Sequence, residues 1–296
     1  MGEAVRVGIL YESGEWSDFK LRDEVAAALG PAGEAVLVNM EDPRCIQGAL
    51  GCSLLVSRVF ASAQFRGHGA SHRAMEQLIP AAGKAGIPLL NPGRAHRFEV
   101  DKQAAAAALG QAGLAVPAIY ARGLPGALDT QALPYPCIVK PNCGGRTTAT
   151  AILADSARAA RFLGDAPDIE FIAEQYIRPA GGFITRVEVV DGTVPLIVKR
   201  SVAEGGLSAY HLGSRYSIYR PHPAAIEALA LRAAAALDFA FGSFDIIEAA
   251  DGTPFFIDAN SVSNVSEDCT ETFGLDLMAA YGRAIARHAL RGHQGS

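Results

Sequence analysis

The stretch FGSFDIIEAADGTPFFIDAN, residues 241–260, decides the fold of the C-terminal half of this chain. Its two apolar runs flank the dipeptide DG at 251–252, and this dipeptide between apolar strands is the strongest short signal for a β-hairpin. Asp258 and Asn260 are two residues apart, so they face the same side of one strand, and the hairpin brings Asp245 of the other strand toward them. The pattern therefore predicts an antiparallel hairpin that gathers three oxygen-bearing side chains.

This gathering of polar groups favours a cation site. Carboxylate and amide groups on apolar strands are costly to bury unless they bind a cation or find hydrogen-bond donors, and Mg²⁺ prefers oxygen ligands. The alternative is that the DxN motif of Asp258 and Asn260 only caps a turn, as such motifs often do. The apolar run PFFI directly before the motif favours the strand, and hence the Mg²⁺ site.

Other strands joined by glycine turns precede this hairpin. A second DG turn at 191–192 lies inside the apolar stretch 184–201, and shorter apolar runs cover 137–141 and 171–177. A helix is expected over 224–237, and another over 275–290 closes the chain. This part of the chain therefore predicts an α+β arrangement, an antiparallel sheet with helices on one face.

The N-terminal part has a different pattern. Short β-branched apolar runs alternate with helical patterns, which is typical of a parallel α/β sheet. The expected strands and helices are, in chain order, strand 5–10, helix 19–29, strand 36–38, helix 45–50, strand 54–59, helix 71–85 and strand 87–90. Asn91 and Pro92 break the alternation before an alanine-rich helix expected over 100–111, which places a first boundary near residue 95.

Composition narrows the class of function. The chain has 296 residues, a formal charge of −5 and a pI near 5.8, which argues against a broad basic surface for nucleic acid or anionic lipid. No apolar run approaches the roughly 18 residues of a membrane helix, and Glu3 stands where a secretory signal would be basic. We therefore expect a cytoplasmic protein that acts on small molecules. The five cysteines have no CxxC spacing and are expected to be free thiols, and Cys143 is expected to be a small packing residue, with a reactive thiol as the alternative.

A glycine-rich loop is the candidate phosphate site. Lys140 ends the run PCIVKP, and the loop NCGGRTT at 142–148 follows, in which Gly144 and Gly145 let the backbone approach a phosphate closely. The alternative is a hairpin turn with one surface lysine. The loop matches neither the P-loop nor the Rossmann motif, so the nucleotide would need another kind of binding fold.

Taken together, six motifs resemble the ATP-grasp superfamily and, within it, the RimK-like carboxylate–amine ligases. They are DK at 101–102, VKP with its glycine loop, EQYI at 174–177, AGGFITRVEVVDG at 180–192, FDII at 244–247 and FIDAN at 256–260. The resemblance implies three domains: a parallel α/β pre-ATP domain at 1–95, a small central lid domain at 96–178, and a C-terminal antiparallel-sheet domain at 179–296. It also implies that ATP binds between the last two.

The resemblance implies roles for individual residues. Lys102 and Lys140 would contact phosphates, and the lid loop with Gly144, Gly145, Arg146 and Thr147 would cover them. Glu174, Gln175, Tyr176 and Ile177 would form the hinge whose main chain binds adenine. Asp245, Asp258 and Asn260 would hold two Mg²⁺ ions, with Mn²⁺ as an alternative ion and with Asp258 standing where glutamate is more usual.

Two departures from the family pattern bear on the substrates. Ile184 replaces the acidic residue of the family motif DIR, although Arg186 is kept. The stretch SVSNVSEDCTETFG at 261–274 replaces the usual Ser-Pro-Gly run after the metal ligands. Contacts between this stretch and the acceptor or the phosphates therefore do not carry over from the family.

The expected reaction joins a carboxylate to an amine at the expense of ATP. The carboxylate would attack the γ-phosphorus to give an acylphosphate, and the amine would then displace phosphate. Two Mg²⁺ ions and Lys140 would offset charge on the transferred group, and Arg186, together with Arg200, would hold the acylphosphate and its oxyanion. The substrates are expected to be amino acids or a short peptide. The oligomeric state is open from the sequence, and the resemblance suggests a homodimer or homotetramer.

Two basic segments are candidates for binding the substrates. Lys199, His211 and Arg215 belong to a segment at 199–220 that is rich in arginine and tyrosine, and His211 could alternatively accept the proton of the attacking amine. Arg58, Arg66 and His72 belong to a second segment, 57–73, which follows a predicted strand end. For each of these residues the alternative is a side chain that simply faces water.

Two other classes of function stay open at this stage. A nucleotide-binding module without catalysis would account for Ile184 and for the altered stretch at 261–274. An ATP-grasp kinase or carboxylase would share the nucleotide site and pass the phosphate to another acceptor.

Overall fold

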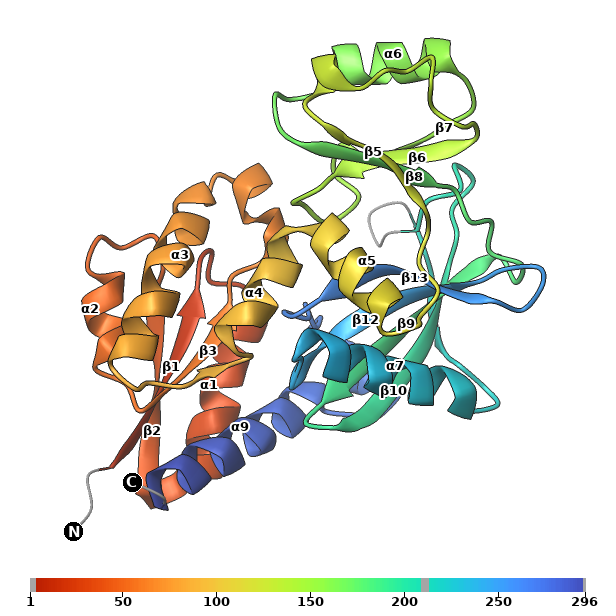
Figure 1. Ribbon diagram of the computed structural model, residues 1–296. Helices are drawn as coiled ribbons and strands as arrows, with labels where there is room; N and C mark the ends of the chain where they lie inside the picture. The colour runs from red at the N-terminus through yellow and green to blue at the C-terminus, as the bar shows by residue number, and fades with distance from the viewer. Residues whose placement is uncertain (1–3, 209–212, 295–296) are drawn as a thin grey trace.

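The protein is described by a computed structural model over residues 4–208 and 213–294. It contains three β-sheets, one for each successive part of the chain (Figure 1). The first sheet is parallel and the other two are antiparallel, so the expected mixed α/β class is confirmed. Within the described ranges, no helix has the length and apolar character that crossing a bilayer requires.

The first sheet has the order β2-β1-β3-β4. Its strands are β1 (Val5–Tyr11), β2 (Gly33–Asn39), β3 (Leu54–Arg58) and β4 (Leu89–Leu90), and its helices are α1 (Trp16–Leu29), α2 (Cys45–Leu50) and α3 (Gly69–Lys84). The neighbouring residues Ile9 and Leu10 of β1 are both completely buried. Because neighbours in a strand point to opposite faces, helices must cover both faces of this sheet, as in other parallel sheets.

The second sheet is small and has the order β5-β8-β6-β7. Its strands are β5 (Ile119–Gly123), β6 (Cys137–Pro141), β7 (Ala151–Leu153) and β8 (Phe171–Gln175). Helix α6 (Ser156–Gly164) begins where the Asp155 side chain accepts a hydrogen bond from Arg158 N, and it packs a small core against the sheet. In Figure 1 this sheet and α6 lie above the third sheet.

The third sheet has the order β11-β10-β9-β12-β13. Its strands are β9 (Phe183–Val190), β10 (Thr193–Ser201), β11 (Tyr216–Ile218), β12 (Phe241–Glu248) and β13 (Pro254–Asn260). Both predicted DG hairpins are confirmed, one between β9 and β10 and the other between β12 and β13. Helix α7 (Ala224–Leu237) covers one face of this sheet and leaves the other face toward the second sheet.

Two helices, not one, connect the first and second sheets. They are α4 (Gly93–Val100), which the sequence did not indicate, and α5 (Lys102–Gln111). The extended backbone of Asp101 separates them, and its side chain caps α5 by accepting a hydrogen bond from Ala104 N. The helix expected over 100–111 therefore starts two residues later, and Lys102 lies in its first turn.

The last helix, α9 (Leu277–Gln294), returns to the first sheet and packs against α1 and β1 (Figure 1). Tyr281 and Ile285 belong to the same core cluster as Val7 and Leu21, so the two ends of the chain share one hydrophobic core. A Cβ at Gly282 would lie 2.6 Å from Glu24 Cβ, which shows how closely α9 approaches α1. The domain boundaries at residues 95 and 178 stay predictions.

Candidate active site

A cavity of about 780 Å³ lies between the second and third sheets. Residues of β6 and β8 line it on one side, and residues of β9, β10, β12 and β13 line it on the other. The segments 60–62 and 144–148, together with a stretch from Val262 to Leu277 that includes α8 (Cys269–Phe273), complete its walls. Three parts of the chain that are distant in sequence thus meet around one space.

The register of the third sheet builds the polar floor of this cavity. Asp245 on β12 lies opposite Arg186 on β9 and opposite Asp258 on β13. Two residues along, Ser243 lies opposite Asn260. Because side chains two residues apart share a face, the three predicted metal ligands come together, and all three line the cavity.

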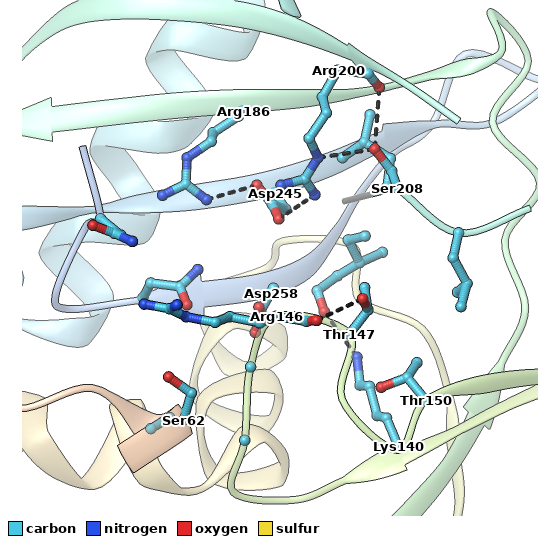
Figure 2. A pocket seen from close by; sticks show the side chains of 18 of the residues that line it. Ser62, Lys140, Arg146, Thr147, Thr150, Arg186, Arg200, Ser208, Asp245 and Asp258 are labelled. Atoms are coloured by element: carbon cyan, nitrogen blue, oxygen red, sulfur yellow. Dashed lines mark hydrogen bonds and ion pairs between the residues drawn. The ribbon is translucent and has the colours of Figure 1, made fainter. Parts of the chain in front are cut away.

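Two arginines flank Asp245 (Figure 2). Arg200 Nη2 lies 2.8 Å from Asp245 Oδ2, and Arg186 Nη1 lies 3.3 Å from Oδ1. Burial would raise the pKa of the Asp245 carboxyl, but the two guanidinium groups outweigh burial and hold that pKa below its usual range. Asp245 is therefore ionised at neutral pH, as a metal ligand must be.

Two lysines lie beside carboxylates of the cavity, Lys102 from α5 and Lys140 from β6. Lys102 Nζ is 2.5 Å from Asp258 Oδ1, and Lys140 Nζ is 2.5 Å from Glu174 Oε1 and 3.1 Å from the carbonyl oxygen of Ile257. This arrangement sets cations for phosphate oxygens next to acidic ligands for a metal.

The residues present fit Mg²⁺. Two carboxylates and one amide oxygen reach the cavity from neighbouring strands, and Mg²⁺ typically takes one or two protein carboxylates while phosphates and water complete its shell. Among the described residues, no group of three or more His, Cys, Asp and Glu side chains could hold a metal ion without such help. The ligand set suits an ion that arrives with a nucleotide.

The glycine loop closes one side of the cavity, and Gly144, Gly145, Arg146 and Thr147 all line it. A Cβ at Gly144 would lie 2.8 Å from the ring of Phe65, so this position has room only for glycine. Arg146 and Thr147 have positive φ angles of 59° and 55°, a backbone conformation that residues other than glycine rarely adopt.

The Cys143 thiol in the same loop is not activated. Burial raises its pKa to about 12, and its Sγ lies within hydrogen-bonding distance of the carbonyl oxygen of Ala61. The thiolate, which is the reactive form, is therefore scarce at neutral pH, which agrees with Cys143 as a small packing residue and argues against the alternative of a reactive thiol.

The predicted hinge residues line the far end of the cavity. Glu174, Gln175, Tyr176 and Ile177 are accompanied there by Ile138 and Ile152 from the second sheet and by Leu207 from the loop after β10. Apolar side chains around a stretch of main chain suit a flat heterocycle that forms hydrogen bonds at its edge.

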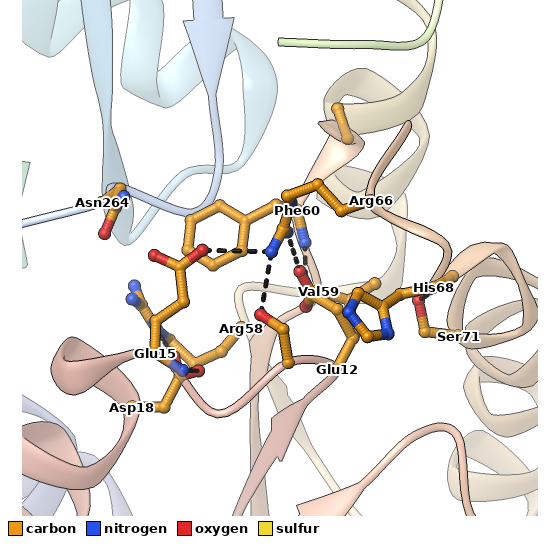
Figure 3. Close-up of polar contacts among 12 residues, drawn as sticks. Glu12, Glu15, Asp18, Arg58, Val59, Phe60, Arg66, His68, Ser71 and Asn264 are labelled. Atoms are coloured by element: carbon orange, nitrogen blue, oxygen red, sulfur yellow. Dashed lines mark hydrogen bonds and ion pairs between the residues drawn. The ribbon is translucent and has the colours of Figure 1, made fainter. Parts of the chain in front are cut away.

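The structure does not bring Arg58, Arg66 and His72 to this cavity. Arg58 is 3% exposed, and it donates to Asp18 Oδ1 at 2.9 Å and to the carbonyl oxygen of Ser263 at 2.7 Å. Arg66 forms ion pairs with Glu12 and Glu15 (Figure 3). His72 Nε2 bonds to the carbonyl oxygen of Phe60. These side chains stabilise the loops after β1 and β3 instead of forming a wall of the site.

The second basic segment is divided between the faces of the third sheet. Arg200 faces the cavity, whereas Lys199 points to the other face, where its Nζ lies 4.1 Å from the centroid of the Tyr219 ring. Arg215 is exposed and does not line the cavity. His211 lies outside the described residues.

Two residues that line the cavity, Glu188 and Glu99, were not predicted from the sequence. Glu188 follows Arg186 by two positions in the strand RVEVV, so strict alternation of charged and apolar residues was a signal that both face one side. Glu99 accepts hydrogen bonds from the backbone of Ala61 and Ser261, which are far from it in sequence, and nothing in the sequence marks it.

Comparison with known proteins gives a family and a fold. A sequence model of the RimK-like ATP-grasp domain matches residues 101–285. No curated protein sequence matches the chain. Among solved structures, D-cycloserine synthetase DcsG is similar at a TM-score of 0.69 and 17% identity, with 96% of this chain and 99% of that chain covered.

Two further solved structures are similar over nearly their full length. A RimK domain ATP-grasp protein from Sphaerobacter thermophilus DSM 20745 has a TM-score of 0.67 and 20% identity, with 95% of this chain and 99% of that chain covered. The ATP-grasp ligase PsnB, complexed with a phosphomimetic variant of its minimal precursor, Mg and ADP, has a TM-score of 0.64 and 16% identity, with coverages of 97% and 98%. At such identities the likeness shows the fold alone.

Proposed function

The chain belongs to the RimK-like ATP-grasp family, and on that premise we propose that it is an ATP-dependent carboxylate–amine ligase. One observation carries the proposal: Arg186 and Arg200 converge on Asp245 on the same cavity face that bears Asp258 and Asn260. On this proposal, Arg186 and Arg200 would hold an acylphosphate, and the acidic side chains beside them would bind the Mg²⁺ of the triphosphate.

The nucleotide would lie along the cavity between the second and third sheets. Its adenine would rest at the hinge of residues 174–177, whose surroundings are apolar. Its phosphates would reach Lys102 and Lys140, with the glycine loop above them. The ATP-grasp family uses ATP and Mg²⁺. We extend this to two ions held by Asp245, Asp258 and Asn260, and to Mn²⁺ as a substitute.

The reaction follows from the charges around Asp245. When bound, Mg²⁺ offsets charge on the phosphate oxygens. Arg200 would hold the substrate carboxylate in line with the γ-phosphorus, where one carboxylate oxygen forms a P–O bond as the bond to ADP breaks. Arg186 and Lys140 would then stabilise the acylphosphate until the amine attacks its carbonyl carbon. The products are an amide, ADP and inorganic phosphate.

Two of the similar structures support a substrate of amino-acid or peptide type. One is a D-cycloserine synthetase and the other a ligase solved with a precursor. The described cavity, at about 780 Å³, can hold a nucleotide and a further small molecule.

Measuring the release of ADP and phosphate distinguishes the proposed ligase from a non-catalytic nucleotide-binding module and from a kinase. ADP and phosphate should be measured with amino acids offered singly and in pairs. We expect ADP formation to require both a carboxylate and an amine and to yield a product whose mass is the sum of the two less water. Nucleotide binding without turnover would select the non-catalytic module, and a stable phosphorylated product from a single acceptor would select a kinase.

A further inference from the structure

Past Arg186 and Arg200 the cavity continues over an apolar wall that phosphate chemistry does not require. The wall consists of Leu196, Val198, Val265, Phe273 and Leu277, which all line the cavity. They belong to, or pack against, one core cluster that also contains α9. A surface of this kind favours an apolar group of a ligand over a hydrated or charged one.

A buried carboxylate stands beside this wall. Glu188 lies opposite Leu196 in the sheet, lines the cavity and is 4% exposed. Its Oε1 accepts a hydrogen bond from Arg186 Nε at 2.8 Å. Its Oε2 is buried and has no hydrogen-bond partner within residues 4–208 and 213–294. A buried carboxyl oxygen left in this way is costly, so a donor brought by a ligand would stabilise it.

The positions of these charges match those of an amino-acid zwitterion. The guanidinium groups of Arg186 and Arg200 meet at Asp245, and Glu188 is two residues from Arg186 along β9. Arg186 contacts both Asp245 and Glu188, so guanidinium groups that can bind an α-carboxylate lie next to a carboxylate that can accept from an α-ammonium.

We propose that the carboxylate substrate is an α-amino acid with an apolar side chain. Its carboxylate binds Arg200, its ammonium donates to Glu188 Oε2, and its side chain rests on the apolar wall. Glu188 is thus a specificity-determining residue, held in place by Arg186. This inference rests on the proposed ligase function, because it concerns the acid that is activated there.

The test uses hydroxylamine as the amine, since it converts any acylphosphate into a hydroxamate whatever the natural acceptor is. L-leucine is compared with L-asparagine, which has a similar shape and a polar side chain, and with 4-methylpentanoate, which lacks the ammonium. We expect kcat/KM for leucine to exceed both by about tenfold or more. Equal or better activity with asparagine or 4-methylpentanoate would overturn the inference.

Substitutions test the role of Glu188. Glu188→Gln keeps the acceptor for Arg186 and removes the charge, so the preference for leucine over 4-methylpentanoate should fall to about threefold or less. Glu248→Gln is the matched control, because Glu248 accepts from Thr185 and Tyr219 and does not line the cavity. An unchanged preference in Glu188→Gln, with its circular dichroism intact, would contradict the assignment.

A binding measurement distinguishes a failure of the proposed amino-acid subsite from a failure of the proposed ligase function. Calorimetry with leucine should be run on the protein holding Mg²⁺ and a non-hydrolysable ATP analogue. Leucine binding that depends on Glu188, without hydroxamate from any acid, would support the subsite and remove the ligase function. Hydroxamate from other acids, without leucine binding, would support the ligase function and remove the subsite.

Discussion

Two clusters of arginines and carboxylates, similar in composition, have different surroundings. We call them the cavity cluster (Arg186, Glu188, Arg200 and Asp245) and the N-terminal cluster (Glu12, Asp18, Arg58 and Arg66). The side chains of Arg186 and Arg200 are 16% and 12% exposed and line the cavity. Those of Arg58 and Asp18 are 4% and 1% exposed and bond to the chain around them. Residue type therefore does not separate a binding site from a structural ion pair, whereas the space beside the charges does.

The largest effect should come from removing a metal ligand beside the cavity cluster. Asp258→Asn replaces an acidic ligand with a neutral one and also leaves Lys102 without its 2.5 Å ion pair. We expect ATP turnover to fall by about a thousandfold or more, because the charge on the phosphates is then poorly offset. ADP release at saturating MgATP measures the loss.

The control for this variant is Asp168→Asn, since Asp168 is exposed and does not line the cavity. It should keep full activity. Near-normal turnover in a folded Asp258→Asn protein would contradict the role of Asp258 as a metal ligand and weaken the contrast with the N-terminal cluster.

The N-terminal cluster should respond in stability instead. Arg58→Met removes the partner of the buried Asp18 and the donor to the carbonyl oxygen of Ser263. We expect a loss of about 3–5 kcal/mol in the free energy of unfolding, the usual result of breaking a buried ion pair. Urea unfolding followed by circular dichroism measures it. At a temperature where the variant stays folded, kcat should change by less than about threefold, and a much larger drop would place Arg58 in the reaction after all.

Adjacent residues on β10 give the sharpest contrast within one sheet. Arg200→Met should lower kcat/KM by about a hundredfold, because the guanidinium beside Asp245 is lost. Lys199→Met should leave kcat/KM nearly unchanged and cost roughly 1 kcal/mol of stability, since Lys199 lies over the rings of Phe183 and Tyr219 and does not line the cavity. Equal effects of the two substitutions on kcat/KM would show that the face of the strand does not decide function.

The same pair shows what could be predicted from the sequence. Local signals were enough for both DG hairpins, for α7 and for the convergence of Asp245, Asp258 and Asn260, because turn chemistry and the two-residue period of a strand are local properties. The two-residue period of a strand also predicts that Lys199 and Arg200 point to opposite faces of the sheet. It does not say which of the two faces meets a cavity, because that depends on where α7 and the second sheet pack.

The features that could not be predicted depend on contacts between distant residues. Arg58 follows a strand like a ligand-binding residue would, but it is covered by Ser263, which is 205 positions away. Helix α9 packs on α1 at the other end of the chain, and nothing local indicates this. The break between α4 and α5 at Asp101 had only a weak local signal, a single capping aspartate within an otherwise helical pattern.

The smallest expected effect tests whether burial or the ion pair with Arg66 has the greater influence on the pKa of Glu12 in the N-terminal cluster. Burial raises the pKa of the Glu12 carboxyl from 4.5 to about 7, and Arg66 beside it offsets only part of that rise. Between pH 4.5 and about pH 7, the folded protein therefore keeps a proton on Glu12 that the unfolded chain releases. The stability that Glu12 contributes is complete below about pH 4.5 and is lost as the pH rises through 7.

The Glu12→Gln variant has no such titration. As the pH rises from 5 to 8, its free energy of unfolding should therefore increase relative to that of the parent protein by about 2.5 kcal/mol. Urea unfolding of both proteins at the two pH values measures this gain. A constant difference would mean that the pKa of Glu12 is not raised, and a change in the opposite direction would mean that Arg66 holds Glu12 ionised. In that last case the N-terminal cluster would resemble the cavity cluster, where guanidinium groups outweigh burial and keep Asp245 ionised.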